Sequence, residues 1–220
     1  MKRQFLTAVI FTCLAAAPGW ATSITIANPS FEDPASAGIQ NGIATGWNVG
    51  NSDAGTWNPT GFATAPDGNQ VLFVGYLGTP SEVSQVLAAN LQANTDYTLA
   101  FYVGSRNDIA FSTYSVSLLA NGNILASDSG GAPGAGGFVF RQISWNSGSN
   151  PAGLGSALEI DINASGLNSL QVGGQAEFDN FSLTSSGTGG SPTPEPASMV
   201  LMGAGLVLLG MSRRKTTAGR

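Results

Sequence analysis

The sequence predicts an all-β protein, and specifically an antiparallel β-sandwich of the jelly-roll type. Glycine and proline are abundant, with 30 and 11 copies among 220 residues, which is well above their average share of about 12%. Charged residues make up only 10% of the chain, whereas helical bundles and coiled coils are rich in Glu and Lys. Short apolar segments alternate with turn residues along the chain, and this pattern is typical of a sandwich with many short strands.

About nine strands are expected between residues 23 and 184. They cover 23–27, 70–76, 82–87, 96–104, 113–120, 123–127, 138–145, 157–163 and 177–184. In 96–104 and in 113–120 the large apolar residues alternate, which places them on one face of each strand. Asn121-Gly122 predicts a tight hairpin turn between two of the strands. Only 82–91 is ambiguous between a strand and a short helix.

The amino terminus has the pattern of a secretory signal peptide. Lys2 and Arg3 precede an apolar run over residues 5–17, and Gly19-Trp20-Ala21 supplies a small-residue cleavage site. We expect residues 1–21 to be removed by signal peptidase after Ala21, which requires export across the inner membrane. The alternative is an uncleaved anchor helix.

The carboxyl terminus combines a linker, a short apolar segment and a basic cluster. Residues 185–193 are rich in Gly, Ser and Pro and predict a flexible linker, so the folded domain is expected to be 22–184. The apolar stretch 197–211 is shorter than the about 20 residues that span a bilayer comfortably. It therefore predicts a marginal transmembrane helix, stopped by basic residues that favour the cytoplasmic side.

This carboxyl-terminal segment, residues 194–215, resembles the PEP-CTERM sorting signal. The resemblance rests on Pro194, Glu195 and Pro196 before the apolar stretch and on Arg213, Arg214 and Lys215 after it. It implies processing by an exosortase in a Gram-negative bacterium that makes extracellular polysaccharide. The protein would be held transiently in the inner membrane and then reach the cell surface or the extracellular matrix. An ordinary tail anchor is the alternative.

Charge and residue types exclude several functions. Between Thr22 and Pro196 there are two Arg and thirteen acidic residues, a formal charge of −11. Such a surface repels phosphate backbones, so nucleic-acid binding is not expected, and it attracts cations. The chain has no His, and its only Cys is Cys13. Disulfides, His- or Cys-dependent catalysis and a zinc site with N/S ligands are therefore excluded.

The domain itself resembles galactose-binding-domain-like modules, a jelly-roll group that includes many carbohydrate-binding modules. The motifs that carry the resemblance are Asn28-Pro29-Ser30-Phe31-Glu32, Gly46-Trp47, Ser84-Gln85-Val86-Leu87, Tyr97-Thr98-Leu99-Ala100-Phe101 and Phe178-Asp179-Asn180-Phe181-Ser182-Leu183. It implies a structural calcium ion between the first and last strands, with Glu32 and Asp179 as ligands.

The position of Asp179 supports this calcium site independently. In an ideal strand Asp179 shares a face with Phe181 and Leu183, so its carboxylate would be buried. A buried carboxylate needs a cation or other partner, and oxygen ligands suit Ca²⁺. The alternative is that Asp179 lies at a bulge and faces water.

A ligand site is expected at one end of the sandwich. Trp57 lies in a polar stretch, Arg106 and Asp108 follow an apolar strand, and Tyr102 faces away from the apolar side of that strand. Exposed aromatic rings with polar neighbours are used by carbohydrate-binding relatives. The alternatives are that Trp57 closes the sandwich edge and that Arg106 only pairs with Asp108. Trp47 and Trp145 are assigned to the core.

The expected function is that of a non-catalytic exported domain that binds polysaccharide or matrix. A structural envelope or matrix protein without a small ligand is the alternative. A glycoside hydrolase is less favoured, because it needs two carboxylates facing each other across a cleft. Glu177 and Asp179 are two residues apart on one predicted strand, a spacing of about 7 Å that makes no cleft by itself.

Overall fold

The computed structural model describes residues 21–51, 53–75, 80–111, 113–165 and 174–187. The predicted signal peptide, apart from Ala21, and the predicted sorting segment lie outside these residues. Within the described part of the chain, no helix is long and apolar enough to cross a membrane.

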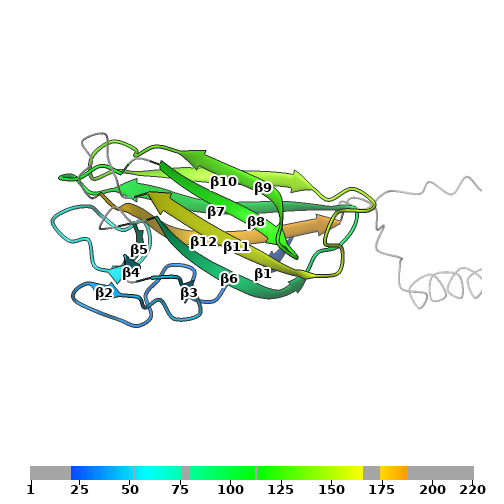
Figure 1. The fold of residues 1–220 in the computed structure, drawn as a ribbon, viewed down its shortest axis with the longest axis horizontal. Coiled ribbons are helices and arrows are strands. Elements are labelled where there is room, and N and C mark those ends of the chain that lie inside the picture. The colour runs from blue at the N-terminus through cyan, green and yellow to red at the C-terminus, as the bar shows by residue number, and fades with distance from the viewer. Residues whose placement is uncertain (1–20, 52, 76–79, 112, 166–173, 188–220) are drawn as a thin grey trace, which may run out of the picture. The chain divides into compact units, whose positions relative to one another are not determined.

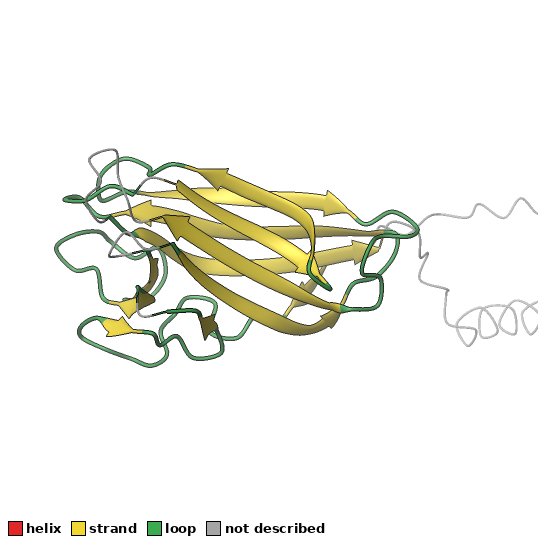
Figure 2. Cartoon of the chain, viewed as in Figure 1, coloured by secondary structure: helices red, strands yellow, loops and turns green. Residues whose placement is uncertain are grey.

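The strands form two antiparallel sheets that lie face to face, which confirms the predicted β-sandwich (Figures 1 and 2). Sheet A has the order β10 (Phe138–Asn146), β7 (Thr95–Ser105), β12 (Ala176–Gly187), β5 (Val71–Val74), β4 (Ala54–Trp57) and β2 (Gln40–Asn41), and β1 (Thr22–Ile24) pairs with β12. Sheet B has the order β3 (Asn48–Val49), β6 (Ser81–Asn90), β11 (Ala157–Ser165), β8 (Thr113–Ala120) and β9 (Asn123–Gly130).

The long strands agree with the sequence patterns, and the short ones were not expected. The ambiguous segment 82–91 is a strand, because β6 runs to Asn90 and pairs with β3 and β11. β2, β3 and β4 have only two to four residues, which is too short for an alternation to be recognised. β12 continues to Gly187, into the predicted linker, since its end pairs with β1 and β7.

The core lies between the sheets and contains the alternating residues that the sequence predicted. Those of β7 and β8 are all buried: Tyr97, Leu99, Phe101, Val103, Tyr114, Val116 and Leu118. Phe31, Trp47 and Phe181 form an aromatic cluster with ring centroids 5.2–5.9 Å apart. Trp47 is therefore a core residue, as predicted, whereas Trp145 is only partly buried and stacks on Tyr97.

A bulge in β12 changes which way Asp179 faces. The pairing of β12 with β7 shifts register between Asp179 and Ser182, and Asn180 has a positive φ of 51°. The extra residue reverses the alternation, so Phe178 and Phe181 both enter the core. Asp179 lies on the outer face of sheet A, and the prediction that it shares a face with Phe181 is wrong.

Part of this outer face is covered by a second, smaller apolar cluster. Trp57, Val71 and Phe73 are buried there, and Ala65 and Phe138 pack against them. Glu177 pairs in register with Phe73, which places its side chain on the covered face. The loop after β4 thus buries a carboxyl group outside the main core.

Candidate functional site

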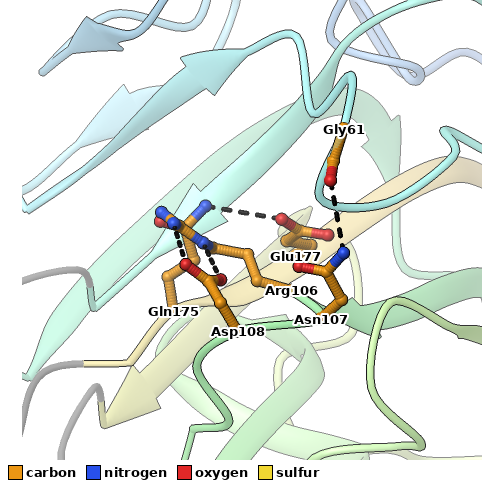
Figure 3. A network of polar contacts seen from close by, with 6 residues as sticks. All are labelled: Gly61, Arg106, Asn107, Asp108, Gln175 and Glu177. Carbon is orange, nitrogen blue, oxygen red and sulfur yellow. Dashed lines mark hydrogen bonds and ion pairs between the residues drawn. The ribbon is translucent and has the colours of Figure 1, made fainter.

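Glu177 is a fully buried acid whose carboxyl group is incompletely hydrogen-bonded. Its residue exposure is 0%, and the Gln175 amide donates to Oε1 over 3.4 Å (Figure 3). Glu177 Oε2 and the buried indole Nε1 of Trp57 make no well-formed hydrogen bond. Burial raises the pKa of Glu177 to about 7, although the positive charge of Arg106 opposes the shift and the indole N–H lies close enough to the carboxyl group to lower its pKa slightly. Near neutral pH this group can both donate and accept a proton.

Arg106 lies over the aromatic rings of this site. Its guanidinium carbon is 5.3 Å from the centroid of Trp57 and 4.4 Å from that of Phe62, which are cation–π distances. Two hydrogen bonds of 2.8 and 2.7 Å join Arg106 to the Asp108 carboxylate. These hydrogen bonds lower the pKa of Asp108. Trp57 is 4% exposed and Phe62 is 36% exposed, so Phe62 presents the accessible ring.

The loop that carries Phe62 is fastened by the residue after Arg106. Asn107 donates from its side-chain amide to the Gly61 carbonyl over 3.2 Å (Figure 3). Its backbone N–H donates to the Phe62 carbonyl over 3.0 Å. Two open depressions flank this loop. One, of about 230 Å³, is lined by Asn58, Pro59, Thr60, Gly61, Ala63, Thr64, Ala65, Gly68 and Asn69. The other, of about 340 Å³, is lined by Gly61, Phe62, Ala63, Thr64, Asn107, Ala135 and Gly136.

Asp179 is as buried as Glu177, but both of its oxygens are occupied. Oδ2 accepts the backbone N–H of Asp67 over 2.8 Å, and Oδ1 accepts that of Asn180 over 2.7 Å. Burial raises the pKa of Asp179 to about 7, and the charges of Asp67 and Glu32 add to the shift while the two N–H groups oppose it. Asp179 therefore anchors the loop before β5 to the last strand.

Glu32 holds the same loop from the other side. Its Oε1 accepts the backbone N–H groups of Asn69 and Gln70 over 2.7 and 2.6 Å. The carboxylates that were predicted to share a calcium ion therefore both bind the 67–70 segment. The described residues contain no group of three or more Asp, Glu, His or Cys side chains that could hold a metal ion. Their oxygen donors suit Ca²⁺ chemically, but their present arrangement is not a preformed metal site.

The structure brings together three of the four predicted ligand-binding residues. Trp57, Arg106 and Asp108 are in contact, although Trp57 lies on a strand and is buried, and Arg106 is paired with Asp108. Tyr102 lies farther along the same face, where its ring packs on Phe140 at 5.4 Å.

Sequence reasoning did not assign Phe62 or Gln175 to the site. It considered Glu177 only as one carboxylate of a hydrolase pair. The usable signal was alternation: Glu177 precedes Phe178 in an apolar strand, which places it on the opposite face from the core.

Comparison with known proteins identifies the family. Residues 22–184 match the HpiC1-like family, described as HpiC1 cyclase. The chain belongs to the HpiC1-like family. Residues 192–215 match the PEP-CTERM protein-sorting motif, which confirms that prediction and implies an exported surface protein sorted by an exosortase. No curated protein matches the chain.

Solved structures agree on the fold. The HpiC1-like domain is similar to the Stig cyclase FisC from Fischerella sp. TAU in complex with (3Z)-3-(1-methyl-2-pyrrolidinylidene)-3H-indole. The TM-score is 0.69 at 24% identity, covering 77% of this chain and 100% of FisC. TmCBM61 in complex with beta-1,4-galactotriose gives a TM-score of 0.52 at 17% identity, covering 74% of this chain and 98% of TmCBM61. The predicted likeness to carbohydrate-binding modules is thus real but more distant than the likeness to cyclases.

Proposed function

We propose that the exported domain is an acid catalyst that binds a small, uncharged, unsaturated organic molecule beside Phe62 and closes a ring in it. The observation that carries this proposal is the buried Glu177 carboxyl group. One of its oxygens and the neighbouring Trp57 indole N–H both lack hydrogen-bond partners. Unpaired buried polar groups are unfavourable for folding, and a bound polar ligand would give them partners. Membership of a family described as cyclase supports the same reading.

The chemistry requires one proton and no cofactor. Protonated Glu177 gives its proton to a carbon–carbon double bond, whose π electrons form the new C–H bond. A second π bond in the same molecule attacks the resulting cation and forms the ring bond. Loss of a proton back to the Glu177 carboxylate restores the double bond and the acid. Substrate and product are isomers, and the raised pKa of about 7 keeps a large share of Glu177 protonated at neutral pH.

Access to Glu177 requires movement of the loop that covers it. The residue is 0% exposed, so no substrate reaches it in the described conformation. The Phe62 segment is joined to Asn107 by two hydrogen bonds and to Arg106 by ring stacking. Such irregular segments open more readily than the paired strands beneath them.

Binding and turnover can be tested separately. The first probe is 4-(1H-indol-3-yl)butan-2-one, which is bound in a cyclase from Fischerella sp. TAU, and its binding is followed by Trp fluorescence. For turnover, the purified domain is incubated with a small-molecule extract of the producing cells, and mass spectrometry follows compounds that change retention time at constant mass.

We expect Glu177→Gln to lower such an isomerisation by about a hundredfold or more. Glu159→Gln, a matched change in sheet B, should leave the rate unchanged. Equal rates in wild type and Glu177→Gln would reject the catalytic role of Glu177.

Polysaccharide binding without catalysis is the second candidate. It is favoured by the aromatic pair of Tyr102 and Phe140, because Phe140 is 52% exposed on the outer face of sheet A. Next to this pair, Gln142 and Ser144 add polar groups that can bond sugar hydroxyls. A glycan array tests this candidate: Phe140→Ala should abolish binding to a neutral polysaccharide, and Glu177→Gln should not. If both candidates fail, a structural matrix role remains.

We also propose that Ca²⁺ binds among Glu32, Asp67 and Asp179 after a small rearrangement of their side chains. The support is electrostatic: the charges of Asp67 and Glu32 both disfavour the ionised form of Asp179, and a divalent cation would relieve that repulsion. The ion would be structural, since these carboxylates already join the amino-terminal segment, the 67–70 segment and the last strand.

A further inference from the structure

The two sheets are packed tightly at one end of strand β10 and loosely at the other. Ile143 and Val139 both point from β10 toward sheet B, since they pair with the core residues Leu99 and Val103. Ile143 is 7% exposed, whereas Val139 is 45% exposed. Residues on one face of one strand therefore differ sharply in burial, because the sandwich is not filled beside Val139.

The unfilled space is a hollow of about 160 Å³ between the edge strands β9 and β10. It is lined by Val103, Tyr114, Gly130, Gly131, Pro133, Val139 and Arg141. Val103, Val139 and Pro133 supply apolar walls. Gly130 forms a wall in close contact with Tyr114, because a Cβ at this position would lie 3.2 Å from the tyrosine ring. The hollow is separate from the Glu177 site, which lies on the opposite face of sheet A.

Polar groups are fixed at one side of the hollow. The Tyr114 hydroxyl donates to the Asp128 carboxylate over 2.7 Å, and Arg141 Nε donates to both, over 2.9 and 3.0 Å. Arg141 Nη2 donates to the second Asp128 oxygen over 3.3 Å. A guanidinium has five N–H donors, and these bonds leave those on Nη1 for an additional acceptor. The charges of Arg141 and Asp128 compensate each other, so the polar side carries no net charge.

We propose that this hollow is a binding site for a neutral, benzene-sized ring that carries one hydroxyl or carbonyl group. An apolar cavity of about 150 Å³ is large enough for benzene, so the space beside Val139 takes one ring. The oxygen of the ligand accepts a hydrogen bond from Arg141. A carboxylate is disfavoured, because Asp128 already neutralises Arg141 and the domain is strongly acidic.

The proposal is tested with benzyl alcohol as the probe and the folded domain labelled with ¹⁵N. Titration should shift the backbone amide signals of Gly130, Gly131 and Val139 and saturate at millimolar concentration, while the amide of Glu177 stays in place. Benzoate should bind at least about tenfold more weakly, a difference of about 1.4 kcal/mol. Val139→Trp fills the hollow and should abolish saturation.

Val86→Trp is the matched control, since Val86 is also an exposed strand valine, at 65%. It should bind the probe as the wild type does. The melting temperature of Val139→Trp shows whether that variant is folded. Absence of saturable shifts in the wild type, or unchanged binding by folded Val139→Trp, would overturn the proposal.

Discussion

Glu177 and Asp179 stand two residues apart on one strand, face the same side of sheet A and are both fully buried. Burial raises the pKa of each to about 7. Their hydrogen-bond partners differ: both Asp179 oxygens accept backbone N–H groups, whereas Glu177 Oε2 accepts none.

This difference separates a structural acid from a candidate catalytic acid. The backbone donors of Asp179 belong to the loop before β5 and to the bulge, so its carboxylate fixes the backbone. The hydrogen bond that Glu177 accepts comes from the side chain of Gln175, and its Oε2 has no hydrogen-bond partner. Burial and pKa are the same for both acids and do not distinguish the two roles. The hydrogen-bond partners of the two carboxyl groups do distinguish them.

The largest expected effect is the pH dependence of stability. A carboxyl whose folded pKa is raised favours folding below its unfolded pKa, and this contribution is lost as pH rises through the folded value. For Glu177 the pKa rises from 4.5 to about 7 on folding. The corresponding loss in the free energy of unfolding is about 3 kcal/mol as pH rises through this range. Urea unfolding of the metal-free domain at pH 5 and pH 8 should show stability falling as pH rises.

Glu177→Gln should remove about half of the total fall in stability that the wild type shows between pH 5 and pH 8. Asp179 should account for the other half. Glu159→Gln is the control for the general effect of removing one negative charge. A wild-type domain with equal stability at both pH values would contradict the raised pKa of both buried acids.

Calcium is expected to distinguish the two acids next most clearly. An ion that binds only the folded state adds about 2.7 kcal/mol at a hundredfold excess over its Kd. The melting temperature in excess Ca²⁺ should exceed that in chelator by several degrees. Asp179→Asn should abolish this increment, and Glu177→Gln should keep it. Identical melting of the wild type in both solutions would reject the calcium site.

The smallest effect is the difference between the two isosteric amide variants in chelator at pH 5, where both buried acids are still largely protonated in the folded domain. Asp179→Asn leaves one backbone N–H without an acceptor and should lower the free energy of unfolding by about 2 kcal/mol. Glu177→Gln should change it by less than about 1 kcal/mol, because Oε2 accepts no hydrogen bond. Equal losses in urea denaturation would show that both acids are structural.

The sequence by itself determined the long strands and the sorting signal at the carboxyl terminus. Alternation over eight or more residues in β7 and β8 identifies which side chains enter the core, because the two faces of a strand differ in polarity over their whole length. The PEP-CTERM signal can also be recognised from sequence alone, because its motif, apolar stretch and basic cluster follow one another directly along the chain.

Only the tertiary structure decided how the site is assembled. The bulge at Asn180 turned Asp179 away from the core and toward the loop before β5. Trp57 is buried because β4 pairs with β5 and the following loop folds over it, although its neighbours in sequence are polar. The Arg106 guanidinium packs on the ring of Phe62, which lies 44 positions earlier in the chain. Such contacts depend on register and loop packing between distant segments, which local composition and periodicity do not specify.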